Sequence, residues 1–193
     1  MSFDFGRAVE RGVKASRQRA YLADILILAA ETGRRISAIL ALRWDDILWD
    51  TKKPHGAIRW RADRDKMGYE WTTPISSKVR AALHRLRRER PGLGATLLFP
   101  SPTKPEEPVS YERVRCWLKK AEMLAKLLKQ LGGSFHPYRR AWATARKHLP
   151  LKDVAAAGGW KTEAVLLRHY QLPDETTILR VVTGGVELRE HQA

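Results

Sequence analysis

The sequence is poor in cysteine and has no long hydrophobic run. Its 193 residues include a single cysteine, Cys116. A disulfide framework within the chain is therefore excluded, and a reducing compartment is the natural location. No secretory signal follows Met1, and the longest apolar run, around residues 25–30, is far too short to span a bilayer. We therefore expect a cytoplasmic protein with no membrane partner.

The sequence also lacks the motifs of nucleotide-dependent and metal-dependent enzymes. It has no P-loop, no C-x-x-C pair and no close carboxylate cluster suited to two metal ions. The six histidines are scattered, which argues against a zinc site; His148 and His169 are better explained as surface or supporting groups. We expect neither a metal nor a cofactor.

Acidic residues are few relative to basic ones. Lys and Arg number 36 against 21 Asp and Glu, which gives a net charge of +15. A positive field of this size favours a polyanionic partner. Nucleic acid is the first candidate, an acidic membrane surface is the second, and a solvated basic surface without a partner is the third. A hydrophobic content of 44%, with seven tryptophans, is enough to form a core.

The spacing of apolar residues predicts a mainly helical fold with a small antiparallel β-sheet, of the α+β class. Residues 1–16 lack periodicity and are interpreted as a flexible arm or linker remnant, residues 17–183 as one domain, and residues 184–193 as a polar tail. A β-hairpin is expected over residues 57–75, with Lys66 at its tip. The expected helices cover residues 17–32, 35–42, 77–90, 110–131, 137–148, 151–157, 162–170 and 174–182.

Several helices carry specific expectations about caps and buried faces. In the first, Leu22, Ile25, Leu26 and Ala29 share one face, and Gly33 is placed to end the helix. Val79, Leu83 and Leu86 are expected to be buried in the helix over residues 77–90. Ser110 is expected to cap the helix that follows the proline-rich loop at 100–108. The residues expected to face inward on that helix are Val114, Trp117, Leu118, Leu124 and Leu128.

Three short stretches have the residue types of a phosphate site. Arg35 follows Gly33 at the predicted start of a helix, where backbone N–H groups and a guanidinium both favour an anion. His136 and Arg139 lie about one turn apart on a helix, which pairs a titrating group with a fixed cation. Gly158-Gly159-Trp160 is followed ten residues later by Tyr170. Taken singly, the first stretch is better explained by an ordinary helix corner and the third by packed aromatic residues, and the second fits a basic surface patch equally well.

The order of these stretches resembles the tyrosine recombinase family, the phage integrase type, over about residues 20–182. The family pattern T-G-x-R followed by W-x-D-I/V is matched by residues 32–35 and 44–47. Its hairpin K-T-G is matched by residues 66–68, its H-x-L-R by residues 136–139, and its L-G-H/W and tyrosine by residues 158–160 and 170. Three positions depart from the pattern: Ala38 replaces an acidic residue, Met67 replaces threonine, and Trp160 stands where histidine is commoner.

The resemblance implies the catalytic domain of a site-specific recombinase that cuts and rejoins double-stranded DNA without metal or ATP. Tyr170 is the expected nucleophile, Arg35 and Arg139 bind the phosphate, and Lys66 protonates the leaving 5′ oxygen. His136 accepts or orients the tyrosine proton or assists the phosphate, and Trp160 donates to a non-bridging oxygen and packs the site. The expected contacts with DNA phosphates are Arg34, Arg64, Arg140 and Lys161.

The resemblance also implies a monomer that forms a homo-tetramer on DNA, with the last helix exchanged between copies or packed on its own domain. The family's N-terminal DNA-clamping domain has no counterpart in this sequence. Three alternatives stay open: a DNA-binding remnant that no longer cuts, which Ala38 favours, a type IB topoisomerase, and a basic helical RNA-binding domain.

Overall fold

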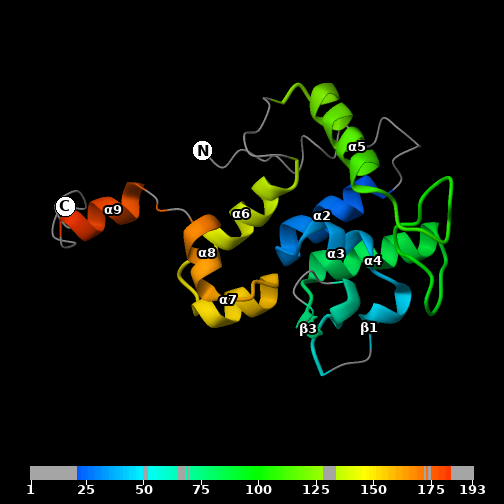
Figure 1. The fold of residues 1–193 in the computed structure, drawn as a ribbon, viewed down its shortest axis with the longest axis horizontal. Coiled ribbons are helices and arrows are strands. Elements are labelled where there is room, and N and C mark those ends of the chain that lie inside the picture. Colours follow the sequence, from blue (N-terminus) through cyan, green and yellow to red (C-terminus); the bar gives the residue numbers. More distant parts are fainter. Residues whose placement is uncertain are drawn as a thin grey trace.

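The computed structural model describes residues 21–49, 52–64, 68, 70–127, 134–171, 173 and 175–183. This part of the chain is mainly helical, with one three-stranded antiparallel sheet beside the helices (Figure 1). The predicted α+β fold class is therefore confirmed. The arm predicted at residues 1–16, the helix start at 17, Lys66 at the hairpin tip and the tail at residues 184–193 lie outside the described residues.

Helix α2 (Leu22–Thr32) is the central element of the fold and packs on α3, α4, α5 and α6. The four residues predicted to share its inner face are all buried. The helix ends at Gly33, whose φ of 64° is left-handed and whose N–H donates to the Ala29 carbonyl at 3.3 Å. The predicted glycine cap is thereby confirmed.

Three antiparallel strands form the sheet, in the order β1-β2-β3. After α3 (Ile36–Leu40), the 3-10 helix η2 (Trp44–Asp46) leads into β1 (Ile47–Leu48). Strand β2 (Ala57–Trp60) is followed by the 3-10 helix η3 (Ala62–Arg64) and then by β3 (Trp71–Pro74).

The register places Trp60 opposite Trp71 and Ala57 opposite Pro74, so the two strands of the predicted hairpin are confirmed. The sequence does not predict η2 or β1, because two or three residues are too few to show a periodicity.

Helices α4 (Ser77–Glu89) and α5 (Tyr111–Leu124) each begin at a serine cap. The Ser76 hydroxyl accepts the Val79 N–H and the Ser110 hydroxyl accepts the Arg113 N–H, both at 3.3 Å. Each bond satisfies one of the backbone donors that a helix start leaves unpaired. The apolar faces predicted for both helices are largely buried, with Trp117 only partly so.

Helix α5 differs from its prediction in length and in one inward residue. It ends at Leu124 instead of about residue 131, because Lys126 adopts a left-handed φ of 54° just after the Ala125 cap. The prediction that Leu124 faces the core is wrong, since this side chain is 50% exposed. The buried stripe runs through Val114, Leu118 and Ala121. At about 100° per residue, Leu124 falls to one side of that stripe. The predicted inward residue Leu128 lies outside the described part.

Helices α6 (His136–Thr144), α7 (Leu151–Gly158) and α8 (Glu163–His169) form the C-terminal part of the fold. Pro137 lies in the first turn of α6, as predicted, but the helix ends about four residues earlier than expected and residues 145–148 form a turn. These helices have a small core of their own, separate from the main core among α2–α5 and the sheet. Its buried members are Trp142, Ala143, Val154, Ala155, Trp160 and Leu166.

Helix α9 (Glu175–Val182) extends away from α6–α8 at the edge of the molecule (Figure 1). Its apolar residues Ile178, Leu179, Val181 and Val182 are all more than half exposed. Across the described ranges, no helix has the length and apolar character needed to cross a membrane.

Candidate active site

The turn between α2 and α3 presents Arg35 at the start of α3. The left-handed Gly33 lets the chain reverse in tight contact with α6, since a Cβ added at Gly33 would lie 2.4 Å from the Trp142 ring. The Trp142 indole in turn donates to the Glu31 carbonyl at 2.9 Å. Arg35 is the N-cap residue of α3, and its guanidinium donates to the Gly159 carbonyl at 3.3 Å. The turn is therefore fixed against both α6 and the residues that follow α7.

The first turn of α6 places His136 and Arg139 in very different environments. His136 is exposed, whereas Arg139 is 3% exposed. The Arg139 guanidinium donates to the carbonyls of Gly33, Gly158 (2.6 Å) and Gly159 (3.4 Å). Its Nε is buried and has no hydrogen-bond partner among the described residues.

Burial lowers the pKa of Arg139, and the charge of nearby Arg35 lowers it further, whereas interaction with the Tyr170 hydroxyl raises it. The guanidinium groups of Arg35 and Arg139 thus lie close together, and that of Arg139 is poorly hydrated. An anion bound there would favour the charged form of both groups.

Trp160 and Tyr170 complete the cluster around Arg139. The Arg139 guanidinium carbon lies 3.6 Å from the centre of the Trp160 ring and 5.2 Å from that of Tyr170. The two aromatic rings meet edge to face at 4.9 Å, and the His136 and Tyr170 ring centres are 6.4 Å apart. Trp160 is 5% exposed, and its indole Nε1 is a second buried donor without a partner in the described part of the chain.

Local geometry explains why Tyr170 and Trp160 occupy these positions. Thr162 caps α8 by accepting the Val165 N–H at 3.4 Å, and Tyr170 is the C-cap residue of the same helix. The Tyr170 carbonyl accepts a hydrogen bond from the Thr144 hydroxyl at 3.0 Å, which holds the end of α8 against α6. A Cβ added at Gly158 would lie 1.9 Å from the Trp160 ring. The glycine is therefore required for the tryptophan to fold back over the end of α7.

These groups surround a cavity of about 690 Å³. Of the predicted catalytic residues, Arg35, His136, Arg139 and Tyr170 line it directly, while Trp160 packs against Arg139 and Tyr170. No carboxylate is among the described residues that line the cavity, so its electrostatic character is positive. The further lining residues are Arg34, Ile36, Ser37, Tyr111, Phe135, Lys161, Thr162 and Val165.

The positions of the predicted DNA contacts vary. Lys161 is exposed and lines the cavity, and Arg140 is partly buried on α6. Arg34 does not have the surface position expected of a contact with the DNA backbone. It is 4% exposed and donates to the carbonyls of Ala157 (2.8 Å) and Ala156 (3.0 Å). The side chain of Arg64, like the whole of Lys66, lies outside the described residues.

Sequence reasoning missed Ser37, Tyr111, Phe135 and Thr162 as cavity residues. Ser37 lies two residues after Arg35 and Thr162 two after Trp160, so proximity to the motifs was the only signal available. Tyr111 comes from α5, and nothing in the sequence brings the start of that helix to the motif residues. Its ring contacts Phe135 at a centroid distance of 6.0 Å.

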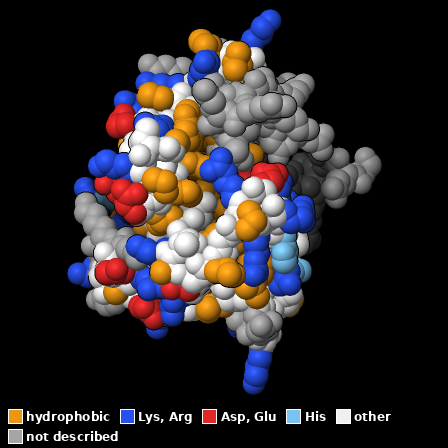
Figure 2. Space-filling view, turned by 90° about the vertical axis from the view of Figure 1, so that its right-hand side faces the viewer, with side chains coloured by type: hydrophobic (Ala, Val, Ile, Leu, Met, Phe, Trp, Pro, Cys, Tyr) orange, Lys and Arg blue, Asp and Glu red, His pale blue; other side chains and the backbone are white. Residues whose placement is uncertain are grey.

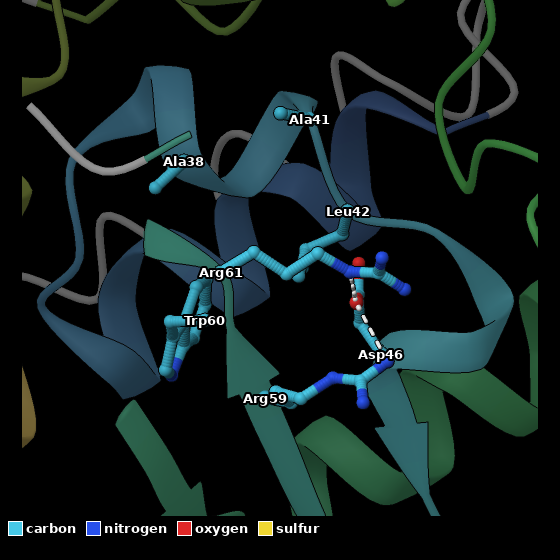
Figure 3. Close-up of a pocket in the computed structure, with 7 residues that line it drawn as sticks. All are labelled: Ala38, Ala41, Leu42, Asp46, Arg59, Trp60 and Arg61. Carbon is cyan, nitrogen blue, oxygen red and sulfur yellow. Dashed lines mark hydrogen bonds and ion pairs between the residues drawn. The ribbon is translucent and has the colours of Figure 1, made fainter. Parts of the chain in front are cut away.

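A second, much smaller pocket adjoins Ala38, the position where an acidic residue was expected from the family pattern (Figure 3). Asp46 is 2% exposed there, accepts Arg61 Nε at 2.5 Å and lies 3.7 Å from Arg59. Ala38 lies on the side of Trp60 and Arg61 and contributes no polar group to this pocket (Figure 3). The carboxylate that neutralises these arginines therefore comes from η2 and not from α3.

Among the residues that the structure describes, no group of three or more His, Cys, Asp or Glu side chains is arranged to hold a metal ion.

Comparison with known proteins identifies the family. A model described as the phage integrase family matches residues 7–176. No curated protein sequence gives a match.

Solved structures with a similar fold include that of the XerA recombinase, which is 16% identical with a TM-score of 0.67 over 93% of this chain and 62% of that one. The XerH site-specific recombinase bound to palindromic difH substrate, a post-cleavage complex, is 17% identical with a TM-score of 0.71 over 95% of this chain and 51% of that one. A lambda integrase dimer bound to a COC′ core site is 20% identical with a TM-score of 0.66 over 89% of this chain and 47% of that one.

At these identities the structural matches show the fold alone. The present chain spans about half to three fifths of the length of these proteins. Because the family model covers residues 7–176 of 193, the chain belongs to the phage integrase family.

Proposed function

We propose that this chain is the catalytic domain of a tyrosine recombinase, which cuts and rejoins double-stranded DNA through a covalent 3′-phosphotyrosyl bond to Tyr170. Membership of the phage integrase family supports the proposal. So do two proteins of similar fold, the XerH site-specific recombinase bound to its difH substrate and lambda integrase bound to a COC′ core site. The cavity of this chain supplies the residue types that such chemistry needs.

One observation carries the proposal: two buried nitrogen donors, Arg139 Nε and Trp160 Nε1, have no partner in the described residues and lie in the cluster that contains Tyr170. A buried donor without a hydrogen bond costs about 1–3 kcal/mol. A fold that keeps two such unpaired donors close to the guanidinium groups of Arg35 and Arg139 is suited to bind a ligand that accepts hydrogen bonds. A phosphodiester, with its charged non-bridging oxygens, suits this arrangement.

The proposed chemistry has two steps of opposite direction. The Tyr170 oxygen attacks phosphorus, the phosphotyrosyl bond forms, and the bond from phosphorus to the 5′ oxygen breaks. Arg35 and Arg139 neutralise the charge that builds on the phosphate, Trp160 donates to a non-bridging oxygen, and His136 accepts or orients the tyrosine proton. Lys66 would protonate the leaving 5′ oxygen. Attack by a 5′ hydroxyl then reverses the step and releases Tyr170, with no metal or ATP consumed.

Contacts outside the cavity would hold the duplex. Arg64, Arg140 and Lys161 are the proposed contacts with backbone phosphates. Lys161 is the best placed of the described residues, since it is exposed and lines the cavity. The excess of basic residues is visible on the face in Figure 2, where Lys and Arg side chains are spread among hydrophobic ones. DNA as the substrate and the single cysteine both favour a cytoplasmic location.

Tetramer formation on DNA would use α9. Its apolar residues are exposed in the isolated chain, with Val181 and Val182 more than three quarters accessible. Apolar residues exposed together on one element are typical of a protein–protein contact. We therefore propose that α9 packs against a neighbouring copy in a ring of four on DNA and that the free protein is a monomer.

A nicked duplex tests the enzymatic proposal directly. Because the target site is unknown, the substrate is a pool of duplexes with random sequence around a nick placed so that the cleaved fragment diffuses away. We expect a covalent protein–DNA adduct, stable in denaturant, that is absent from Tyr170→Phe. The matched control is Tyr111→Phe, which removes a phenol from the same cavity and should still form the adduct.

The alternative of a DNA-binding remnant is favoured by Ala38, which contributes no polar group to the pocket in Figure 3. If the unmodified chain binds duplex DNA but yields no adduct from any member of the pool, the remnant is the correct function and the proposal of cleavage is withdrawn.

A further inference from the structure

Arg34 is buried in a way that an ordinary DNA contact would not be. It is 4% exposed, yet it carries a permanent positive charge. Its Nε donates to the Ala157 carbonyl and its NH2 to the Ala156 carbonyl, at 2.8 and 3.0 Å. Its guanidinium carbon lies 4.9 Å from the centre of the Trp60 ring. The charge is therefore held by backbone carbonyls on one side and an aromatic face on the other.

The carbonyls bound by Arg34 belong to the end of α7. Helix C-terminal carbonyls lack partners within the helix and carry a partial negative charge, so a guanidinium is a fitting partner for them. The next two carbonyls along the chain, those of Gly158 and Gly159, accept hydrogen bonds from Arg139, and that of Gly159 also accepts from Arg35. Four consecutive carbonyls thus hold three arginines, and the position of this one segment determines where Arg35 and Arg139 lie.

Arg34 also joins the two cores of the fold. Trp60 belongs to the main core, whereas Ala157, whose carbonyl Arg34 binds, packs against the small core of α6–α8. Arg35 begins α3, whose buried residues belong to the main core, and Tyr170 packs against the small core. The distance between Arg35, which would bind the phosphate, and Tyr170, the proposed nucleophile, therefore depends on how the two cores are held together. Arg34 contacts both cores.

Gly159 is shaped to accept Arg34. Its φ is +71°, and a Cβ added there would lie 2.4 Å from the Arg34 NH1 atom. Ala38, one turn into α3, provides no carboxylate that could hold the arginine turn from its other side. Arg34 and Arg35 reach the end of α7 through its backbone carbonyls.

We propose that Arg34 is a positioning residue for DNA cleavage: by binding the Ala156 and Ala157 carbonyls it fixes the Gly158–Gly159 segment, and through it the placement of Arg35 and Arg139 around the scissile phosphate. The inference rests on the proposed function and deepens it. It differs from the sequence-based expectation that Arg34 contacts the DNA backbone, and the two roles predict opposite results.

Arg34→Lys separates the two roles because it keeps the charge and loses the planar fork that binds two carbonyls. A positioning role predicts that the cleavage rate at saturating DNA falls by about a hundredfold. A reacting group misplaced by about 1 Å reduces an enzymatic rate by about this factor. The positioning role also predicts that the salt dependence of duplex binding stays unchanged, because the charge is kept, and that duplex affinity falls by no more than the affinity for one phosphate. If Arg34 instead contacts the DNA backbone, Arg34→Lys should change neither the cleavage rate at saturating DNA nor the duplex affinity by much. For Arg34→Met such a contact predicts weaker binding, with a salt slope smaller by about 0.9.

Two controls accompany this measurement. Arg88→Met removes an exposed charge from the last turn of α4 and should leave cleavage at saturation unchanged. Far-ultraviolet circular dichroism and thermal unfolding show whether each Arg34 variant is folded. Retention of the full cleavage rate by a folded Arg34→Lys, or a change confined to duplex affinity, overturns the inference.

Sulfate binding, followed by its effect on the melting temperature, provides a readout that does not need cleavage. Sulfate stands in for the phosphate held by Arg35 and Arg139. We expect the sulfate dissociation constant to rise about tenfold in Arg34→Lys, and an unchanged constant contradicts the positioning role. If the unmodified chain binds sulfate but forms no adduct, the proposed function fails while this measurement still decides the role of Arg34.

Discussion

Two arginines that carry the proposed chemistry donate hydrogen bonds to backbone carbonyls of the turns around them. Arg139 donates to Gly33, Gly158 and Gly159, and Arg35 donates to Gly159. Carbonyls hold a guanidinium without cancelling its charge, whereas a paired carboxylate would neutralise it. The carbonyls that bind Arg139 therefore leave its positive charge available for a phosphate, although burial and the charge of Arg35 lower its pKa.

Asp24 is an unfavourable buried charge at neutral pH. It is 1% exposed, one of its oxygens accepts from Arg85, and the other is buried with no partner in the described chain. Burial raises its pKa to about 6, although Arg85 opposes the shift. The folded state thus holds this proton more tightly than the unfolded state does. The contribution of Asp24 to stability is present below about pH 4 and is lost as the pH rises to about 6.

We predict that Asp24→Asn removes this pH dependence. At about 1.4 kcal/mol per pKa unit, the free energy of unfolding of the unmodified chain should fall by roughly 2 kcal/mol more than that of the variant between pH 4 and pH 6. Urea unfolding across this range provides the measurement. Glu106→Gln, on an exposed loop, is the control and should follow the unmodified chain. Parallel curves for Asp24→Asn and the unmodified chain would show that the carboxyl titrates normally.

At the scale of elements, the site depends on how closely α6 approaches the turn between α2 and α3. Gly33 has a left-handed φ of 64°, and the Trp142 ring occupies the place where a Cβ would be. The Trp142 indole donates to the carbonyl of Glu31 in the last turn of α2. This packing brings Arg139 of α6 within hydrogen-bond reach of the Gly33 carbonyl. A side chain at Gly33 would therefore disturb both the backbone and the arginine.

We predict that Gly33→Ala lowers the free energy of unfolding by about 3 kcal/mol, because left-handed strain and overpacking against Trp142 add together. Gly94→Ala is a matched control. Gly94 has a similar φ of 57°, but nothing lies within 4 Å of an added Cβ, so only the strain of about 1 kcal/mol should appear. Chemical denaturation of the two variants measures the difference. Equal losses would mean that the Trp142 contact adds nothing.

At the scale of the whole molecule, the cavity is lined from both parts of the fold. Arg35 and Ile36 belong to the part built on the main core, and His136, Arg139 and Tyr170 to the helices around the small core. Helix α9 follows beyond the small core and leaves its apolar side chains exposed. The proposed catalytic cluster and the proposed assembly helix are thus joined through the short segment after Tyr170.

We predict that a chain truncated after Pro173 keeps its monomer stability and loses association on DNA. The free energy of unfolding should change by less than about 1 kcal/mol, because the apolar side chains of α9 are mostly exposed. Analytical ultracentrifugation with and without duplex DNA measures the assembly. Ile178→Ser in the full-length chain is the companion variant and should weaken assembly in the same direction. A large loss of monomer stability on truncation would show instead that α9 packs on its own domain.

Much of the local structure follows from the sequence alone. Gly33 ends α2, Ser110 begins α5 and Pro137 lies in the first turn of α6, as expected from the conformational limits of glycine, the capping hydroxyl of serine and the fixed φ of proline. The hairpin strands follow from β-forming residues on either side of a turn. The motif order also indicates the family and four of the residues that line the cavity.

Only the tertiary structure decides which side chains border the cavity and which are buried among other parts of the protein. Arg34 and Arg35 are neighbours of the same type, and both contact the end of α7, yet the first is buried there against Trp60 while the second caps the helix that borders the cavity. Tyr111 reaches the cavity from a helix that has no motif, and Leu124 turns to solvent where α5 ends. Sequence patterns report the conformational preference of each segment, because those preferences are local. The partners of a charged side chain depend on segments more than a hundred residues away, and packing alone brings them together.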